Sequence, residues 1–191
     1  MNFKKLIFSN RSYTPIPIAI TIIFFSSFKF PFYLGGVILV FFGETIRFSA
    51  VRYAGGATRT LKVGAPSLCT SGPYAFTRNP LYLGNMIIYI GFVCFSGGPY
   101  LVELLLFVCF YFAFQYSMII SLEEKTLYEK FDNSYFDYVK NVPRLFPRLS
   151  RWKSEDNRKP MNFIKILKTE KRSLQNIFLI TSLILIKNLY V

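Results

Sequence analysis

The sequence predicts an all-α fold, a polytopic membrane helix bundle, from three observations. The chain has 191 residues, of which 52% are hydrophobic, 19% aromatic and 17% charged, against roughly 25% charged residues in a typical soluble protein. The mean hydropathy is +0.35. Long apolar runs alternate with basic segments along the chain. We therefore expect four core transmembrane helices, a cytoplasmic amphipathic helix, and a C-terminal hydrophobic segment that is either a fifth span or an interfacial anchor.

The first two predicted spans are close together in the sequence. An apolar run begins at Ile16 and reaches Tyr33, which is long enough to cross a hydrocarbon core of roughly 30 Å. The second span extends from Pro31 to Tyr53, and the short junction predicts a tight antiparallel hairpin. Glu44 and Arg47 lie at positions i and i+3 on one helix face, so we expect an ion pair between them.

A structured loop and two further spans follow. Residues 54–79 contain several Gly and Pro residues that break a helix, and three cations that exclude lipid exposure: Arg59, Lys62 and Arg78. We expect a third span from Leu81 to Phe95. After the turn at Gly97-Gly98-Pro99, a fourth span extends from Tyr100 to about Leu122.

After the fourth span the chain becomes polar. The segment from Glu123 to Arg151 carries aromatic residues at the spacing of one helical face: Tyr128, Phe131, Tyr135 and Tyr138. We expect an amphipathic helix that ends at Pro143 and closes a helical domain of residues 1–151. Residues 152–173 are expected to form a basic linker. Residues 174–191 are the C-terminal hydrophobic segment, in which Lys187 would snorkel.

The charge distribution predicts an orientation. The formal net charge is +13, from 23 Lys and Arg against 10 Asp and Glu. In an apolar chain this surplus indicates cytoplasmic loops, and we expect no nucleic-acid partner. Five basic residues lie from Arg47 to Arg78 and 13 from Lys125 to Arg172, whereas the turn between the third and fourth spans has none. The positive-inside rule therefore places the N-terminus and both basic segments in the cytoplasm, next to membrane lipid.

Two features of the composition restrict the chemistry. The chain has no His, which excludes Ser-His-Asp triads and His-zinc sites. The three cysteines, Cys69, Cys94 and Cys109, lack the spacing of a metal cluster or a disulfide framework. We therefore expect no bound metal.

Two polar segments meet at the cytoplasmic face and form the candidate site. The third and fourth spans are joined by a short turn, so Tyr82 and Glu123 are expected to lie close together. Pro80 begins the third span, where free backbone N–H groups and the helix dipole favour a carboxylate. Gly84 lets a flat group approach the backbone, and Glu123 or Glu124 accepts hydrogen bonds from a cationic or hydroxyl-bearing group. The pattern predicts a site for a zwitterion.

The residues of this site also carry a family resemblance. They are Gly72-Pro73-Tyr74, Arg78-Asn79-Pro80-Leu81-Tyr82-Leu83-Gly84, Glu123-Glu124, and the following Leu127, Phe131, Tyr135, Tyr138 and Val142-Pro143-Arg144. Over about residues 50 to 148 the chain resembles the isoprenylcysteine carboxyl methyltransferase and phospholipid methyltransferase family. The resemblance implies an integral-membrane methyltransferase that binds S-adenosylmethionine and methylates a lipophilic acceptor.

The resemblance further implies roles for individual residues. Tyr74 would contact the cofactor, and Leu68 and Cys69 would lie along its adenosine. Glu123 and Glu124 would fix its polar groups. Its amino-acid end and sulfonium would be lined by the consecutive residues Asn79, Pro80, Leu81 and Tyr82. Gly84, two residues after Tyr82, would also belong to the cofactor site.

Three positions depart from the family pattern. Asn79 replaces the usual His; it keeps a donor and an acceptor but does not titrate, which favours a carboxylate acceptor over a protonated amine. Asp132 stands where a Gly often follows the aromatic residue and indicates a local change of turn. Ile119 stands where the isoprenylcysteine enzymes carry an Arg, which argues against isoprenylcysteine itself as the substrate.

We expect direct methyl transfer, in which the protein positions the reactants and excludes water. The favoured acceptor is the carboxylate of a lipidated or hydrophobic compound. A phospholipid amine and a non-catalytic membrane scaffold that has kept the fold stay open as alternatives. A small transporter is disfavoured because the sequence shows no broken helices in repeated halves. The sequence leaves the acceptor and the oligomeric state open.

Overall fold

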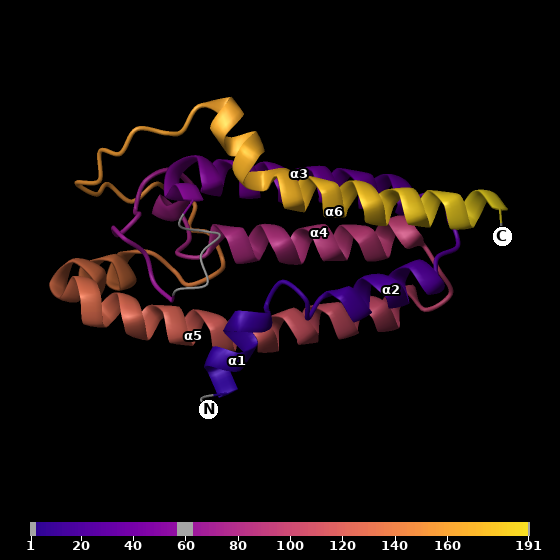
Figure 1. The fold of residues 1–191 in the computed structure, drawn as a ribbon, viewed down its shortest axis with the longest axis horizontal. Helices are drawn as coiled ribbons and strands as arrows, with labels where there is room; N and C mark the ends of the chain where they lie inside the picture. Colours follow the sequence, from indigo (N-terminus) through magenta and orange to yellow (C-terminus); the bar gives the residue numbers. More distant parts are fainter. Residues whose placement is uncertain (1–2, 57–62, 191) are drawn as a thin grey trace.

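The computed structural model describes residues 3–56 and 63–190, and within these ranges it is helical and contains no strand. Its elements are α1 (Phe3–Asn10), α2 (Ile16–Phe24), α3 (Phe32–Ala54), the 3-10 helix η2 (Gly72–Ala75), α4 (Pro80–Ser96), α5 (Leu101–Asn141) and α6 (Phe163–Tyr190). Figure 1 shows α3, α4, α5 and α6 running along the long axis of the molecule. The predicted all-α fold is confirmed. Arg59 and Lys62, which the sequence analysis assigns to a loop, lie outside the described residues.

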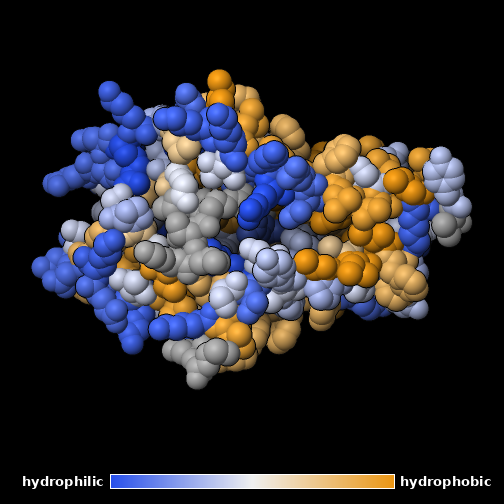
Figure 2. Space-filling view, in the orientation of Figure 1, coloured by the Kyte–Doolittle hydropathy of each residue, from blue (hydrophilic) through white to orange (hydrophobic). Residues whose placement is uncertain are grey.

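The long helices agree with a polytopic membrane protein. Within the described residues, α3, α5 and α6 are long and apolar enough to cross a membrane, and α4 is a shorter apolar helix of 17 residues. The second, third and fourth predicted spans correspond to α3, to α4 and to the first part of α5. Figure 2 shows hydrophobic residues along much of these helices and hydrophilic residues gathered at the end where the chain between α5 and α6 lies.

The first predicted span differs from the structure. α2 has nine residues and ends at Phe24, so it rises about 14 Å, half the thickness of the hydrocarbon core. Beyond it, the Ser27 N–H donates to Ser96 O of α4 at 2.7 Å instead of continuing the helix. At Gly98 a Cβ would overlap the carbonyl of Phe25. The helix therefore stops because the following residues pack against the turn between α4 and α5.

Glycines bring α3 and α4 into close contact. A Cβ on Gly43 of α3 would lie 2.8 Å from Gly84 O of α4, and a Cβ on Gly91 of α4 would lie 3.0 Å from Gly36 O of α3. Such small residues at two levels let the helix backbones approach each other, as is common between membrane helices.

α5 continues past the predicted end of the fourth span and includes the predicted amphipathic helix. The backbone at Asp132 has φ 40° and ψ −119°, which interrupts the regular helix at the position where the sequence analysis expects a local change of turn. Tyr135 and Tyr138 of the predicted aromatic face are buried, whereas Tyr128 is exposed. The helix ends at Asn141, before Pro143, as predicted.

The segment predicted to be a basic linker is ordered, and its C-terminal part is helical. Residues 152–162, called the strap below, run without regular structure, and α6 begins at Phe163. The predicted C-terminal segment therefore belongs to a helix of 28 residues. Lys187 Nζ donates to Ser26 O at 3.0 Å and also to Phe24 O, at the C-terminal end of α2.

A cluster of polar side chains lies inside the bundle and joins three helices. The predicted ion pair is confirmed, with Arg47 Nε 3.3 Å from Glu44 Oε2. The same guanidinium lies 2.5 Å from Glu170 Oε2 of α6, donates to Ser173 Oγ at 2.9 Å, and donates to Asn85 Oδ1 of α4. Arg47 and Glu170 are both buried. The cluster fixes α6 against α3 and the first turns of α4.

Candidate functional site

The candidate site is built around the N-terminus of α4. Pro80 is its first residue and is buried, which fits a position whose N–H would have no helical partner. Asn79 precedes it but makes no side-chain cap, because its Nδ2 donates instead to Arg144 O at 2.8 Å. The N–H groups of the first turn are therefore not covered by a capping side chain, and Leu81 lies half-buried among them.

The two predicted motifs meet. The Tyr82 hydroxyl of α4 donates to Glu123 Oε1 of α5 at 2.9 Å. The ring of Tyr82 also lies 4.6 Å from that of Tyr116, measured between centroids. This confirms the expectation that the short turn after α4 brings these ends together, and it places an acidic acceptor and two aromatic rings side by side.

Glu124 has a different environment from Glu123. Its Oε1 accepts from Arg78 at 2.9 Å, and its Oε2 lies 2.5 Å from the guanidinium of Arg144. The Arg78 guanidinium also donates to Val139 O at 3.2 Å. Glu124 therefore ties the loop before α4 to the chain after α5, and its carboxylate is occupied by two arginines.

The loop around η2 carries the next predicted group of residues. Gly72 has φ +60°, and a Cβ there would overlap the Tyr53 ring, so this position requires glycine on two grounds. The Tyr138 hydroxyl donates to Tyr74 O at 2.7 Å and holds η2 against α5. Burial, together with Cys69 and Glu123, raises the pKa of the Tyr74 phenol.

The strap covers Leu68 and Cys69. Arg158 donates to Leu68 O at 2.5 Å, and Asp156 Oδ2 accepts from the Thr70 N–H at 2.9 Å. Burial raises the pKa of the Cys69 thiol to about 11. Although partial burial opposes it, the Thr70 N–H and the Arg158 guanidinium lower the pKa of Asp156. The strap is thus attached to the predicted adenosine side by partly buried polar contacts.

The structure gives Gly84 a packing role. A Cβ on Gly84 would lie 2.7 Å from Arg47 Cγ and 2.8 Å from Gly43 O, so this face of α4 is filled by α3. From the sequence we expect Gly84 to let a ligand approach the backbone, whereas in the structure it lets α3 approach.

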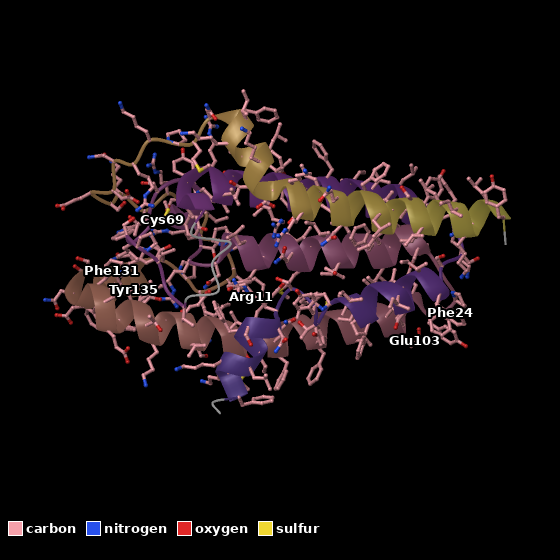
Figure 3. The ribbon with its side chains drawn as sticks, viewed as in Figure 1. Arg11, Phe24, Cys69, Glu103, Phe131 and Tyr135 are labelled. Carbon is pink, nitrogen blue, oxygen red and sulfur yellow. The ribbon has the colours of Figure 1, made fainter. Side chains whose placement is uncertain are left out.

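Several residues of the site carry no signal in the sequence. Asp156 and Arg158 belong to a segment whose alternating charges are typical of a solvated linker. Arg11, between α1 and α2, lies near Glu123 in space and acts on it electrostatically. Figure 3 shows Cys69 and Tyr135 at the same end of the molecule, and Glu103 at the opposite end. Among residues 3–56 and 63–190, no three His, Cys, Asp or Glu side chains gather in a metal-binding group.

The fold and the site define a class of protein, a polytopic helical membrane protein with a polar site at one end of its bundle. The profile of the family described as phospholipid methyltransferase matches residues 31–134, more than half of the chain. The chain therefore belongs to the phospholipid methyltransferase family. The matched residues include α3, η2, α4 and the Tyr82–Glu123 contact, and they exclude the strap and α6.

Two curated relatives are similar over part of the chain. The nickel-cobalt-cadmium resistance protein NccN of Alcaligenes xylosoxydans xylosoxydans is 34% identical over 88 residues, 46% of this chain and 39% of the relative. The cobalt-zinc-cadmium resistance protein CzcN of Cupriavidus metallidurans is 32% identical over 89 residues, 47% of this chain and 39% of the relative. The matched region thus spans about two fifths of the length of each relative. No solved structure matches the chain.

Proposed function

We propose that this protein is an S-adenosylmethionine-dependent membrane methyltransferase that acts on a lipophilic acceptor. The observation that carries the proposal is the hydrogen bond between Tyr82 and Glu123. It joins the two motifs of the family at the uncapped N-terminus of a membrane helix, where an amino-acid carboxylate is favoured.

The residues present fit the cofactor. The first-turn N–H groups of α4, at Leu81 and Tyr82, suit its carboxylate, and Glu123 suits its ammonium or a hydroxyl group. Leu68 and Cys69 line the adenosine side, and Tyr74 joins the two ends. Glu124, bound by Arg78 and Arg144, acts as a positioning residue that fixes the loop before α4.

The bound cofactor supplies a methyl group that is already activated on a sulfonium. The chain therefore needs only to position the two reactants and to exclude water. Positioning the reactants contributes up to roughly 7–11 kcal/mol to the rate acceleration. The ring of Tyr82 packs on that of Tyr116 and keeps this region apolar. A cation placed against an aromatic ring such as Tyr82 gains about 0.5–2 kcal/mol. The strap and the buried Tyr138 close the site on the side away from the spans.

We favour a carboxylate on a lipidated or hydrophobic compound as the acceptor. The amide of Asn79 is engaged by Arg144 O and does not titrate, so it supplies no base for a protonated amine. We also place the basic end and the N-terminus in the cytoplasm, by the positive-inside rule. The names of the two relatives refer to resistance to metal ions and specify no acceptor.

The experiment follows radiolabelled methyl from S-adenosylmethionine into the lipids and small molecules of membranes that contain the protein. We expect the label in an apolar ester. The double variant Tyr82→Phe, Glu123→Gln is expected to lose this label. The control variant Glu129→Gln, on the exposed face of α5, is expected to keep it. Label in a phospholipid headgroup would overturn the carboxylate acceptor. If no label is transferred and the protein gives no calorimetric response to the cofactor, the proposal that it is a methyltransferase is overturned.

A further inference from the structure

A hollow lies between the C-terminal end of α3 and the beginning of α6, and neither Tyr82 nor Glu123 is among its lining residues. Its volume is about 350 Å³, within the range of ligand sites. Its lining residues are Phe48, Ser49, Arg52, Met161, Asn162, Phe163 and Ile166. Figure 1 shows the two elements that form it, the end of α3 and the first turns of α6, side by side.

The walls of the hollow are built by specific contacts. The Met161 N–H donates to Arg52 O at 2.8 Å, which attaches the end of the strap to the end of α3. The Asn162 side chain accepts from the Lys165 N–H at 3.0 Å and begins α6. The rings of Phe48 and Phe163 lie 6.2 Å apart, measured between centroids. The hollow is therefore part of the fold, formed where the strap becomes a helix.

The chemistry of the lining is divided into a cationic and an apolar part. Arg52 is exposed and is the charged residue among those that line the hollow; Ser49 and Asn162 add polar groups. Two further exposed cations, Lys159 and Lys165, lie within three residues of the lining in the sequence. No described lining residue is acidic. A planar guanidinium in such a place suits an oxyanion and above all a phosphate.

The apolar part continues along the exposed side of α6. Phe163 is 65% exposed and Ile164 63% exposed, so large hydrophobic surface extends from the hollow along the start of α6. A free phosphate would gain nothing from this apolar surface, whereas an acyl chain would be stabilised by burying its own apolar surface against it. Basic pockets between membrane helices on the positively charged side are typical sites of acidic lipid headgroups.

We propose that the hollow between α3 and α6 binds an anionic phospholipid, with its phosphate on Arg52 and an acyl chain along Phe163 and α6. The site is distinct from the proposed cofactor site and does not depend on methyl transfer. Arg52 is adjacent to Tyr53, whose ring packs under Gly72, so a bound lipid would brace the end of α3 next to the loop of the candidate site.

The test uses the full chain purified in detergent. Short-chain phosphatidylglycerol, short-chain phosphatidylcholine and inorganic phosphate are titrated separately, and binding is followed by native mass spectrometry and by thermal unfolding. We expect phosphatidylglycerol to bind and to raise the unfolding temperature more than the other two. In Arg52→Gln its affinity falls by about tenfold, the loss of one charge-assisted contact.

Two further variants make the result decisive. Ser49→Trp fills the hollow without removing charge and is expected to weaken phosphatidylglycerol binding as well. Arg151→Gln removes an exposed cation of the same basic segment outside the lining and is expected to leave the affinity within about twofold. Equal binding of the two lipids, an unchanged affinity in Arg52→Gln, or stabilisation by phosphate alone equal to that by phosphatidylglycerol would each overturn the proposal.

Discussion

Arg47 of α3 and Glu170 of α6 form an ion pair of 2.5 Å between two buried side chains that are 123 positions apart in the sequence. Removing Glu170 takes away the shorter of the two carboxylate contacts of the buried Arg47 and leaves Glu44 at 3.3 Å as its acidic partner, so the cost is up to about 3–5 kcal/mol, the value for a fully broken buried pair. We expect Glu170→Ala to lower the thermal unfolding midpoint of the purified protein strongly. The combined replacement Glu44→Leu, Arg47→Met, Glu170→Leu removes all three charges of the cluster and is expected to restore part of the loss.

The chain contains a control for this prediction. Lys125 and Glu129 form an exposed pair at 3.9 Å on α5, with side chains 76% and 66% exposed. Glu129→Ala is expected to change the midpoint little, because exposed pairs contribute about 0–1 kcal/mol. Equal losses in Glu170→Ala and Glu129→Ala would contradict a buried ion pair.

Tyr82→Phe tests the contact between the two motifs. The variant keeps the ring and loses the hydrogen bond to Glu123, so we expect cofactor affinity measured by calorimetry to fall by about tenfold, with a small change in stability. Tyr100→Phe, at the exposed N-cap of α5, serves as the matched control. If Tyr82→Phe binds the cofactor as tightly as the wild type, the hydrogen bond between Tyr82 and Glu123 is not part of the cofactor site.

Cys69 gives a pH-dependent signal. In a Cys94→Ser, Cys109→Ser background, its alkylation rate is expected to rise about tenfold per pH unit up to a pKa of about 11, because the thiolate is the nucleophile. The same thiol in the unfolded chain reaches its plateau near pH 8.5. Cofactor is expected to slow the folded-state reaction. A plateau near pH 8.5 in the native protein would show that the strap does not bury this residue.

Asp156→Asn tests the attachment of the strap. The carboxyl has a lowered pKa in the folded state, so its contribution to stability is present above the unfolded value of about 3.9 and is lost as the pH falls through the lower folded value. The difference in unfolding midpoint between wild type and variant is therefore expected at neutral pH and should narrow below about pH 4. Glu155→Gln, on the exposed side of the strap, should show no such difference.

Gly43→Ala tests the close approach of α3 and α4. The new Cβ would lie 2.8 Å from Gly84 O, so the helices must separate, at a cost of about 1–3 kcal/mol despite the better helix propensity of Ala. Gly35→Ala lies on the same helix with nothing within 4 Å and should be neutral or stabilising in the same unfolding assay. If both substitutions stabilise the protein, the two helices are not packed through glycine.

The parts of the fold that depend on local pattern were predictable. The i, i+3 spacing of Glu44 and Arg47 implies their ion pair, and the short turn after α4 implies the approach of Tyr82 to Glu123. The early end of α2 was not predictable, because it depends on a hydrogen bond from Ser27 to Ser96, a residue far away in the sequence.

The same limit applies to the candidate site and to the polar cluster around Arg47. Asp156 and Glu170 lie in a basic, polar segment that is typical of a solvated linker, and their partners are 86 and 123 positions away. Periodicity describes which face a residue occupies, but it does not describe what meets that face. Asn79 and Glu124 were located correctly as parts of one end of the bundle, yet their engagement by the chain around Arg144 depends on the tertiary fold.

α6 lies outside the matched family region, and yet it is attached at both ends. Near its N-terminal end Glu170 meets α3, and near its C-terminal end Lys187 and Asn188 bind the chain that follows α2. A helix attached at both ends restricts the relative movement of the two elements that it joins. If α2 moved along its axis relative to α3, one of the two attachments would break. α6 therefore fixes the axial position of α2 relative to α3.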